Sequence, residues 1–202
     1  MDGKQVDQRR VYIVVVQAAL ELDEQSIVCK SVKVSRCSLS SHLAFVHHIF
    51  DGGARDRLFT RVHDLLRPIV ARAETLGVTL VMENIEDIDP ADRKDLCQSF
   101  GSSALQLSID TGHAHYAHGS NGAPPVDYYV KSAGEMLAHV HLQDADGYAD
   151  RHWQIGNGSI LWPSVFKALA DLPVQPRLIL ELADKSGIPA SMAFLQSKGL
   201  GQ

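Results

Sequence analysis

The sequence predicts an α/β fold in which helices alternate with the strands of a parallel sheet. Segments with helical apolar spacing alternate with short apolar runs along most of the chain. Several of these runs end in an ionisable residue, which is typical of strands that lead into an active site. No repeat, low-complexity stretch or linker divides the 202 residues, so we expect one domain over residues 1–202.

The composition is that of an ordinary globular protein, with 45% hydrophobic and 21% charged residues. The 24 acidic residues outnumber the 19 basic ones, which argues against a nucleic-acid binder because phosphate contacts need clustered Lys and Arg. Three cysteines without a CxxC spacing argue against a disulfide framework or a thiolate zinc site. Residues 11–16 form the longest apolar run, too short to span a membrane, and we expect a cytoplasmic protein.

The clearest predicted helix covers residues 57–76, where apolar residues recur at spacings of three and four. Pro68 is expected to kink this helix, and Gly77 is well placed to end it. Residues 78–83 follow as a short apolar run rich in β-branched residues, which predicts a buried strand.

The same alternation recurs toward the C-terminus. We expect helices over residues 91–100, 127–135 and 161–171, and strands over residues 105–110, 136–141 and 177–181. Alternating helices and buried strands form βα units, and such units build a parallel sheet.

Four of the predicted strands end in an ionisable residue: Glu83, Asp110, His141 and Glu181. The carboxyl ends of parallel strands share one face, so these side chains are expected to converge. Because unpaired buried charges are costly, a divalent cation shared by three carboxylates and an imidazole would account for the pattern. The alternative is that each residue is a solvated strand end or has an ion-pair partner of its own.

Further candidate ligands are found among the ten histidines. His113 lies three residues after Asp110, a spacing that fits one helical turn or a tight loop. Asp150 and His152 form a D-x-H pair, whose side chains would face the same way in an extended segment and could chelate one ion. A surface Asp–His pair in a turn is the alternative.

The other residues near these motifs have less specific expectations. His139 lies deeper in its strand and is expected to be a core histidine. Asp144 could orient a metal ligand. His115 could point into the site, and His118, beside Gly119, is expected in a solvated loop.

Five motifs in order carry a family resemblance: MEN at 82–84, IDTGH at 109–113, HVHLQD at 139–144, DRHWQIGNG at 150–158 and LILE at 178–181. Together they resemble the xylose isomerase-like (β/α)8 barrel superfamily, which includes sugar-phosphate isomerases and epimerases, hydroxypyruvate isomerase, inosose dehydratase and endonuclease IV. The resemblance covers roughly residues 42–182. It implies a (β/α)8 TIM-type barrel. Residues 1–41 are atypical because they are too few for the first barrel units, so we expect a barrel that is incomplete or truncated at the N-terminus.

The resemblance also implies roles for individual residues. In the epimerase branch, the positions of Glu83, Asp110, His141 and Glu181 bind one metal ion, and the two glutamates transfer protons. Substrate would be bound by the histidines at the remaining matched positions, namely His113, His152 and one of His47 and His48. In endonuclease IV, the positions of His113, Asp150 and His152 hold an additional zinc.

The implied function is a sugar or keto-sugar (phosphate) isomerase or epimerase that needs one divalent ion, Mn²⁺, Mg²⁺, Co²⁺ or Zn²⁺. Proton transfer would pass through a metal-stabilised enediolate. The expected partner is a small sugar or sugar phosphate. No membrane partner is expected, nucleic acid is not the expected partner, and a homo-oligomer is possible. The alternatives are an endonuclease IV-like zinc phosphodiesterase, an inosose-type dehydratase and a catalytically degenerate barrel.

Overall fold

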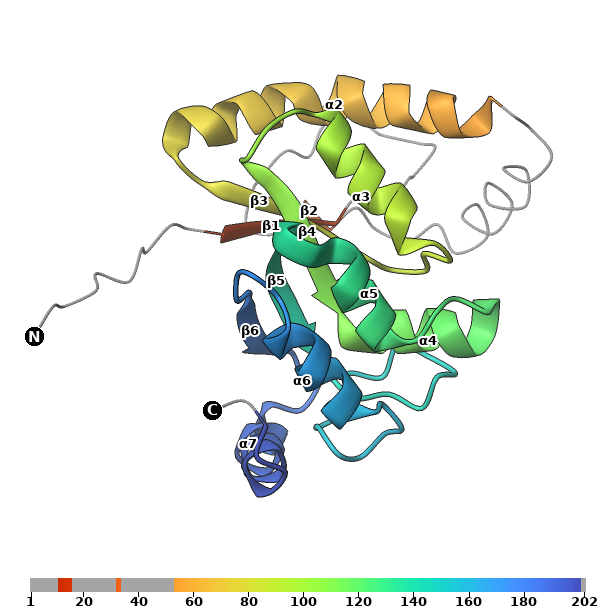
Figure 1. Cartoon of the computed structure of the whole chain (residues 1–202), viewed down its shortest axis with the longest axis vertical. Helices are drawn as coiled ribbons and strands as arrows, with labels where there is room; N and C mark the ends of the chain where they lie inside the picture. The colour runs from red at the N-terminus through yellow and green to blue at the C-terminus, as the bar shows by residue number, and fades with distance from the viewer. Residues whose placement is uncertain (1–10, 16–31, 34–52, 201–202) are drawn as a thin grey trace, which may run out of the picture. The chain divides into compact units, whose positions relative to one another are not determined.

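The computed structural model describes residues 11–15, 32–33 and 53–200 (Figure 1). The chain divides into two compact units, each treated separately below. The first contains Met1–Val81 and Phe100–Leu105, and the second contains Met82–Ser99 and Gln106–Gln202. His47 and His48 lie outside the described residues, so their expected role stays a prediction.

The first unit contains two short paired strands and one long helix. Strands β1 (Val11–Val15) and β2 (Val32–Lys33) pair in parallel. Helix α2 (Ala54–Leu76) includes Pro68 and ends at Gly77, whose φ of +62° is the left-handed conformation that favours glycine. Val62, Leu66 and Val70 form part of its buried face. None of the described helices, α2 included, is long and apolar enough to cross a membrane.

The second unit has the βα alternation that the sequence predicts. Strand β3 (Thr79–Glu83) ends in this unit, where the hydrogen-bonded strand order is β3-β4-β5-β6. Strands β4, β5 and β6 pair in parallel. These strands are β4 (Leu105–Asp110), β5 (Leu137–Leu142) and β6 (Arg177–Leu180), and the helices are α3 (Pro90–Ser99), α4 (Thr111–Asn121), α5 (Val126–Ala133), α6 (Trp162–Ala170) and α7 (Ile188–Ser197). The 3-10 turns η1 (Gly134–Met136) and η2 (Lys185–Gly187) precede β5 and α7.

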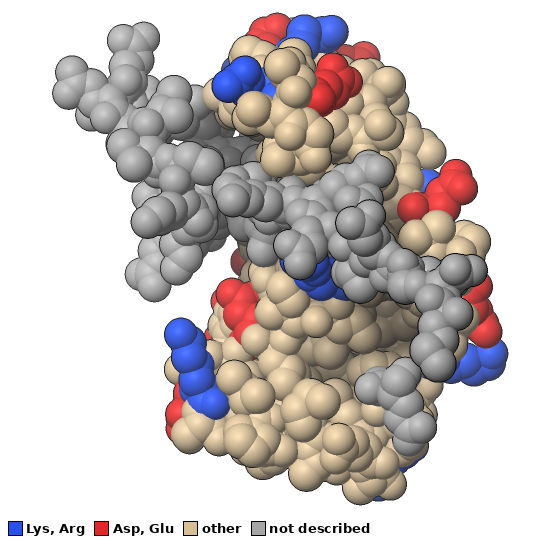
Figure 2. Space-filling view, turned by 90° about the vertical axis from the view of Figure 1, so that its left-hand side faces the viewer, with Lys and Arg blue, Asp and Glu red and all other residues tan. Residues whose placement is uncertain are grey.

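Apolar side chains from the middle strands and their helices form the core of the second unit. Ile109 of β4 and Val140 of β5 are buried, and helices α5 and α6 pack against each other. Strand β6 differs, because Leu178 and Ile179 are 38% and 40% exposed. The surface of the unit near α7, at the bottom of Figure 2, carries few charged side chains. An exposed apolar strand agrees with the expectation of an incomplete barrel, since strands of a complete parallel barrel are buried on both faces.

The predicted helices and strands from residue 57 to 181 match the structure within a few residues, but two helices were missed. Residues 111–121 form α4 rather than a loop, and Asp110 is its N-cap, accepting a hydrogen bond from the His113 N–H. His118 therefore lies in a helix, where its Nδ1 is 2.6 Å from the Ala123 carbonyl oxygen. The expectation of a loop was wrong, whereas the expected exposure of His118 to solvent is confirmed. Helix α7 near the C-terminus had not been predicted either.

The Cys97 thiol on α3 is fully buried beside Met82. Burial raises the pKa of this thiol to about 12, although nearby Arg93 opposes the shift. Because the thiolate is the reactive form, we expect the Cys97 peptide to resist iodoacetamide at about pH 8 in the native protein and to react in denaturant. Mass-spectrometric peptide mapping measures this at Cys97 alone. Rapid native alkylation there would contradict the buried position.

Candidate metal centre

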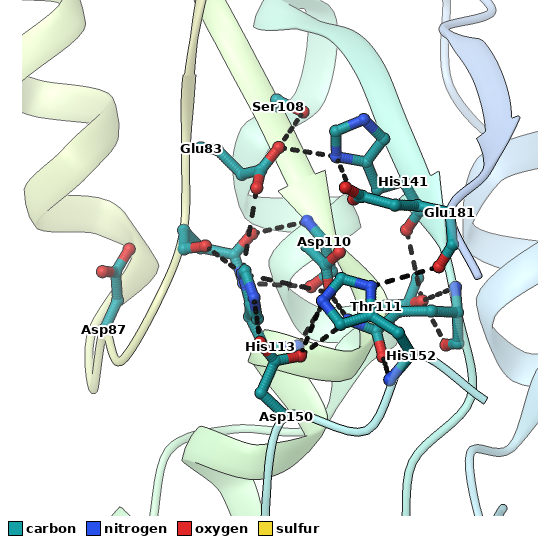
Figure 3. Close-up of polar contacts among 12 residues, drawn as sticks. Glu83, Asp87, Ser108, Asp110, Thr111, His113, His141, Asp150, His152 and Glu181 are labelled. Atoms are coloured by element: carbon teal, nitrogen blue, oxygen red, sulfur yellow. Dashed lines mark hydrogen bonds and ion pairs between the residues drawn. The ribbon is translucent and has the colours of Figure 1, made fainter. Parts of the chain in front are cut away.

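Four side chains converge at the carboxyl ends of β3, β4, β5 and β6. The register sets Asp110 opposite His141, and His141 opposite Ile179, two residues before Glu181. Glu83, Asp110 and His141 are buried, whereas the Glu181 side chain is 44% exposed. Figure 3 shows Glu83, His141 and Glu181 grouped together, with Asp110 beside them. The structure thus brings together the four residues that the sequence places at strand ends.

His141 lies between the two glutamates. Its Nδ1 is 2.8 Å from Glu83 Oε2 and 3.0 Å from Glu181 Oε2. Burial alone would lower the pKa of His141, but the contacts with Glu181 and Glu83 outweigh it and raise the pKa to about 10. The same contact with His141 lowers the pKa of Glu181. A charged imidazole therefore lies between the two carboxylates and bridges them.

Asp110 is held by groups on both sides of its strand end. Its Oδ1 accepts hydrogen bonds from the His113 N–H at 2.8 Å and from Gln143 Nε2 at 3.0 Å. Asn84 fixes its backbone, because the Asp110 N–H donates to Asn84 Oδ1 at 2.7 Å and Asn84 Nδ2 donates to the Asp110 carbonyl. Burial raises the pKa of the Asp110 carboxyl, and the neighbouring His113 opposes this. A rigid, desolvated carboxylate of this kind is stabilised by a nearby cation.

Two buried atoms of this cluster favour a metal ion there. Within the described part of the chain, Asp110 Oδ2 has no hydrogen-bond partner, and the close contacts of His141 Nδ1 lack hydrogen-bond geometry. Leaving such a buried group unsatisfied costs about 1–3 kcal/mol, which a coordinated cation would offset. Ligand atoms of Glu83, Asp110 and His113 lie within 4.8 Å of one another, as do those of Asp110, His152 and Glu181. Oxygen atoms with one imidazole suit several divalent ions, so these donors fit a divalent metal. Neither group includes His141, whose Nδ1 is in contact with Glu83 and Glu181 instead.

A second group of ligand atoms is formed by His113, Asp150 and His152, all within 4.8 Å. His113 Nε2 is 3.3 Å from Asp150 Oδ2, and His152 Nε2 is 3.0 Å from Asp150 Oδ1. The other nitrogen of each ring, Nδ1, faces a backbone carbonyl, that of Asn84 for His113 and that of Glu181 for His152. If Nδ1–H donates to these carbonyls, each histidine directs the lone pair of Nε2 at the same point, as metal-binding histidines do.

Charges within this second group are strongly coupled. Burial would lower the pKa of His113, but Asp110 and Asp150 raise it to about 10. The hydrogen bond to Asp150 raises the pKa of His152 to about 9. Burial opposes ionisation of Asp150, yet His113 and His152 together hold its pKa below the usual range. Protons on the two imidazoles occupy the position in which a cation would be bound.

The conformation of His152 differs from the expected extended segment. Its φ is +51°, in the left-handed region, and its backbone N–H donates to Gln143 Oε1 at 2.6 Å. Asp150 and His152 therefore meet with His152 in a left-handed conformation, and the extended geometry assumed from the D-x-H spacing was wrong. This conformation costs backbone strain, which the hydrogen bond to Gln143 helps to offset.

Ser108 and His139 extend the site below the strand ends. Ser108 Oγ donates to Glu83 Oε2 at 3.4 Å and lies 3.0 Å from His139 Nδ1. Burial, together with the nearby His141, lowers the pKa of His139 to about 4, so this ring is neutral at pH 7. His139 is thus the core histidine that the sequence suggests, and Ser108 is a site residue that it missed.

Asp144 and His115 have structural roles instead of the expected site contacts. Asp144 is buried and accepts hydrogen bonds from the Gly156 N–H at 2.8 Å and from Trp162 Nε1 at 3.0 Å. It therefore anchors the segment that follows His152 and orients no metal ligand directly. His115 Nε2 is 2.8 Å from Ser159 Oγ, outside both ligand groups.

Replacing Asp144 by alanine is expected to lower the free energy of unfolding by about 2–4 kcal/mol, because several buried N–H donors lose their acceptor. Denaturant unfolding measures this change. The control is Asp171→Ala, which removes an exposed carboxylate paired with Lys167 and should cost less than about 1 kcal/mol. Equal effects of the two substitutions would contradict the anchoring role.

A family model described as the xylose isomerase-like TIM barrel matches residues 7–198. The chain belongs to this family. The described residues contribute six strands toward its eight-stranded barrel, in agreement with the incomplete barrel expected from the sequence.

One curated relative of this TIM-barrel chain is the uncharacterised protein MJ1311 of Methanocaldococcus jannaschii. It is 26% identical over 163 residues, which cover 78% of this chain and 50% of the relative. The chain therefore spans about half the length of the relative that it matches.

Solved structures of the same fold include a D-tagatose 3-epimerase-like protein. It is 23% identical with a TM-score of 0.60, and the match covers 79% of this chain and 56% of that one. The protein TTHB071 from Thermus thermophilus, soaked with ZnCl2, is 28% identical with a TM-score of 0.55 and coverage of 73% and 57%. The IOLI protein with a bound zinc atom is 17% identical, with a TM-score of 0.55 and coverage of 72% and 55%. The similarities to the D-tagatose 3-epimerase-like protein and to the IOLI protein concern the fold alone.

Proposed function

We propose that this xylose isomerase-like chain carries the site of a divalent-metal-dependent isomerase or epimerase acting on a sugar or keto-sugar, free or phosphorylated. The observation that carries the proposal is the pair of carboxylates, Glu83 and Glu181, placed on either side of His141 within 3.0 Å of its Nδ1. Asp110, which is buried, would complete the set of donors for one ion. The sugar epimerases among proteins of the same fold support this reading.

Glu83, Asp110, His141 and Glu181 would hold the ion, which, when bound, supplies Lewis-acid stabilisation of negative charge on the substrate oxygens. Glu181 is the more exposed glutamate, and its lowered pKa keeps it ionised as a base. It is suited to remove a proton from the carbon next to the substrate carbonyl. Each such general acid–base transfer contributes about 10²–10⁴-fold to the rate.

Glu83 is suited to the complementary transfer. Its carboxyl group is buried and oriented by the Ser108 hydroxyl, so its protonated form could deliver a proton from a fixed direction while Glu181 keeps the proton that it removed. Return to the opposite face of the same carbon gives an epimer, whereas return to the neighbouring carbon gives an isomer. His113 and His152, with side chains 16% and 25% exposed, would bind substrate hydroxyl groups.

Solvent exchange tests the proposal. The full chain, loaded with Mn²⁺ in D₂O, is incubated with a panel of ketoses and ketose phosphates, and deuterium next to the carbonyl is followed by NMR. We expect incorporation into at least one sugar, with none after removal of the metal. Loss of water instead of exchange would indicate an inosose-type dehydratase. Absence of both reactions in protein that retains its ion would contradict the proposal and indicate a degenerate barrel.

A zinc phosphodiesterase is the second candidate. The group formed by His113, Asp150 and His152 favours it, because paired metal ions suit phosphoryl displacement. The net charge of −5 weighs against a DNA substrate. Zinc-loaded protein would be assayed with bis(4-nitrophenyl) phosphate and with an oligonucleotide containing an abasic site. Cleavage of either without ketose exchange would favour this candidate.

A further inference from the structure

Gln143 connects the two ligand groups through a side chain that is 0% exposed. Its Nε2 donates to Asp110 Oδ1 and to Asp150 Oδ1, both at 3.0 Å. Its Oε1 accepts the backbone N–H of His152 at 2.6 Å. Both amide protons and the amide oxygen are therefore used, each toward a residue of the candidate metal centre.

The position of this amide is fixed by the first turn of α4. The Gln143 N–H donates to Thr111 Oγ1 at 3.0 Å, and the Thr111 hydroxyl donates to the Gln143 carbonyl at 2.7 Å. Gly112 leaves the space that the amide occupies, because a Cβ atom there would lie 2.3 Å from Gln143 Cδ and Oε1. Any larger residue at position 112 would push the amide away from Asp110.

The chemistry of the three contacts favours a primary amide. Two carboxylate oxygens need two donors, and the His152 N–H needs an acceptor, all from one planar group. A carboxylate at this position would repel Asp110 and Asp150, while an ammonium group would offer His152 no acceptor. The same amide supports the left-handed backbone of His152, on which the approach of its ring to Asp150 depends.

We propose that Gln143 is a positioning residue that fixes the Asp150–His152 turn against Asp110, so that the two ligand groups form one continuous centre. The expected effect of Gln143 on metal affinity rests on the proposed function, because it requires that these two groups bind ions. Gly112 supports this role, because it leaves the space that the Gln143 amide occupies. Neither residue touches substrate in this account, and both act through the ligands that Gln143 holds.

The test compares Gln143→Met with Gln175→Met in the full chain. Gln175 is exposed, and its amide donates to the carbonyl of Leu169. The control therefore makes the same chemical change at a residue that contacts none of the candidate ligands. Gly112→Ala is the second variant, because alanine is the better helix former and any loss must come from displacement of the Gln143 amide. The readouts are amide hydrogen exchange of residues 150–158 without metal, and Zn²⁺ affinity by equilibrium dialysis against a competing chelator.

We expect faster exchange of residues 150–158 in Gln143→Met and Gly112→Ala, and not in Gln175→Met. We also expect a Zn²⁺ affinity about 10–100-fold weaker for the ion held by Asp150 and His152. Exchange and affinity equal to those of Gln175→Met would overturn the proposal. If the wild-type chain bound no ion at this group while exchange still rose in the variants, the second metal site would be wrong and the positioning role would stand. A lower melting temperature with unchanged exchange and affinity would show a merely structural role.

Discussion

Replacing Glu181 by glutamine is expected to lower the rate of deuterium exchange into the substrate by about 10²–10⁴-fold. The amide keeps the size of the side chain but can neither accept the substrate proton nor give His141 an ionised partner at 3.0 Å. It also removes one anionic ligand, so the metal content of the purified variant should fall with the rate. NMR detection of exchange and elemental analysis of the same sample measure both effects.

The matched control for this substitution is Glu135→Gln, which changes an exposed glutamate on the 3-10 turn before β5. It should retain the metal content and the exchange rate of the wild type. An active Glu181→Gln variant with its full metal content would rule out Glu181 both as base and as ligand, and the proposed division of roles between the two glutamates would then be wrong.

If His113, Asp150 and His152 hold a second zinc, as the phosphodiesterase candidate requires, replacing Asp150 by asparagine is expected to abolish its binding while the first ion remains. The carboxylate of Asp150 is the anionic member of its group and contacts both His113 Nε2 and His152 Nε2. The four strand-end ligands are unchanged, so zinc measured by elemental analysis should fall from about two to about one per chain. Any phosphodiesterase activity should disappear with the second ion.

Asp146→Asn is the control for Asp150→Asn. Asp146 lies in the same loop and pairs with Arg151, but it belongs to neither ligand group. It should leave the zinc content unchanged. If Asp150→Asn also retained all of its zinc, the group formed by His113, Asp150 and His152 would be an ion-pair cluster that neutralises itself without metal.

Strand direction explains why so much of the site could be predicted. Residues at the carboxyl ends of parallel strands must share one face, and the register of β4 with β5 sets Asp110 opposite His141 accordingly. This inference needs no knowledge of the loops. It identifies the four strand-end residues because they are ionisable, and a charge is costly to bury without a partner.

Neutral polar residues were harder to find. Ser108 and Gln143 each lie two residues from a strand-end ligand, Asp110 and His141 respectively, so strand alternation places them on the same face. That spacing was the available signal, but an uncharged hydroxyl or amide gives no reason to expect a partner. The turn at His152 could not be predicted either, since its left-handed backbone depends on the tertiary contact with Gln143.

Helix α4 shows a different limit. Its two glycines and its cluster of histidines give it weak helix propensity and no clear apolar face. Asp110 is nevertheless a good N-cap, so the helix begins where the strand ends. One carboxylate thus ends β4 and caps α4. Its proposed role as a metal ligand follows from the strand end and was predicted, whereas its role as the cap was not.

A crystal of the full chain grown with MnCl₂ would test the central claim most directly, by anomalous scattering from manganese. The claim is that Glu83, Asp110, His141 and Glu181 hold one divalent cation. It predicts an anomalous peak surrounded by these four side chains, at about the 2.0–2.2 Å typical of oxygen and nitrogen ligands. A peak elsewhere, or none in manganese-saturated crystals, would contradict the claim and leave His141 as the lasting bridge between the two glutamates.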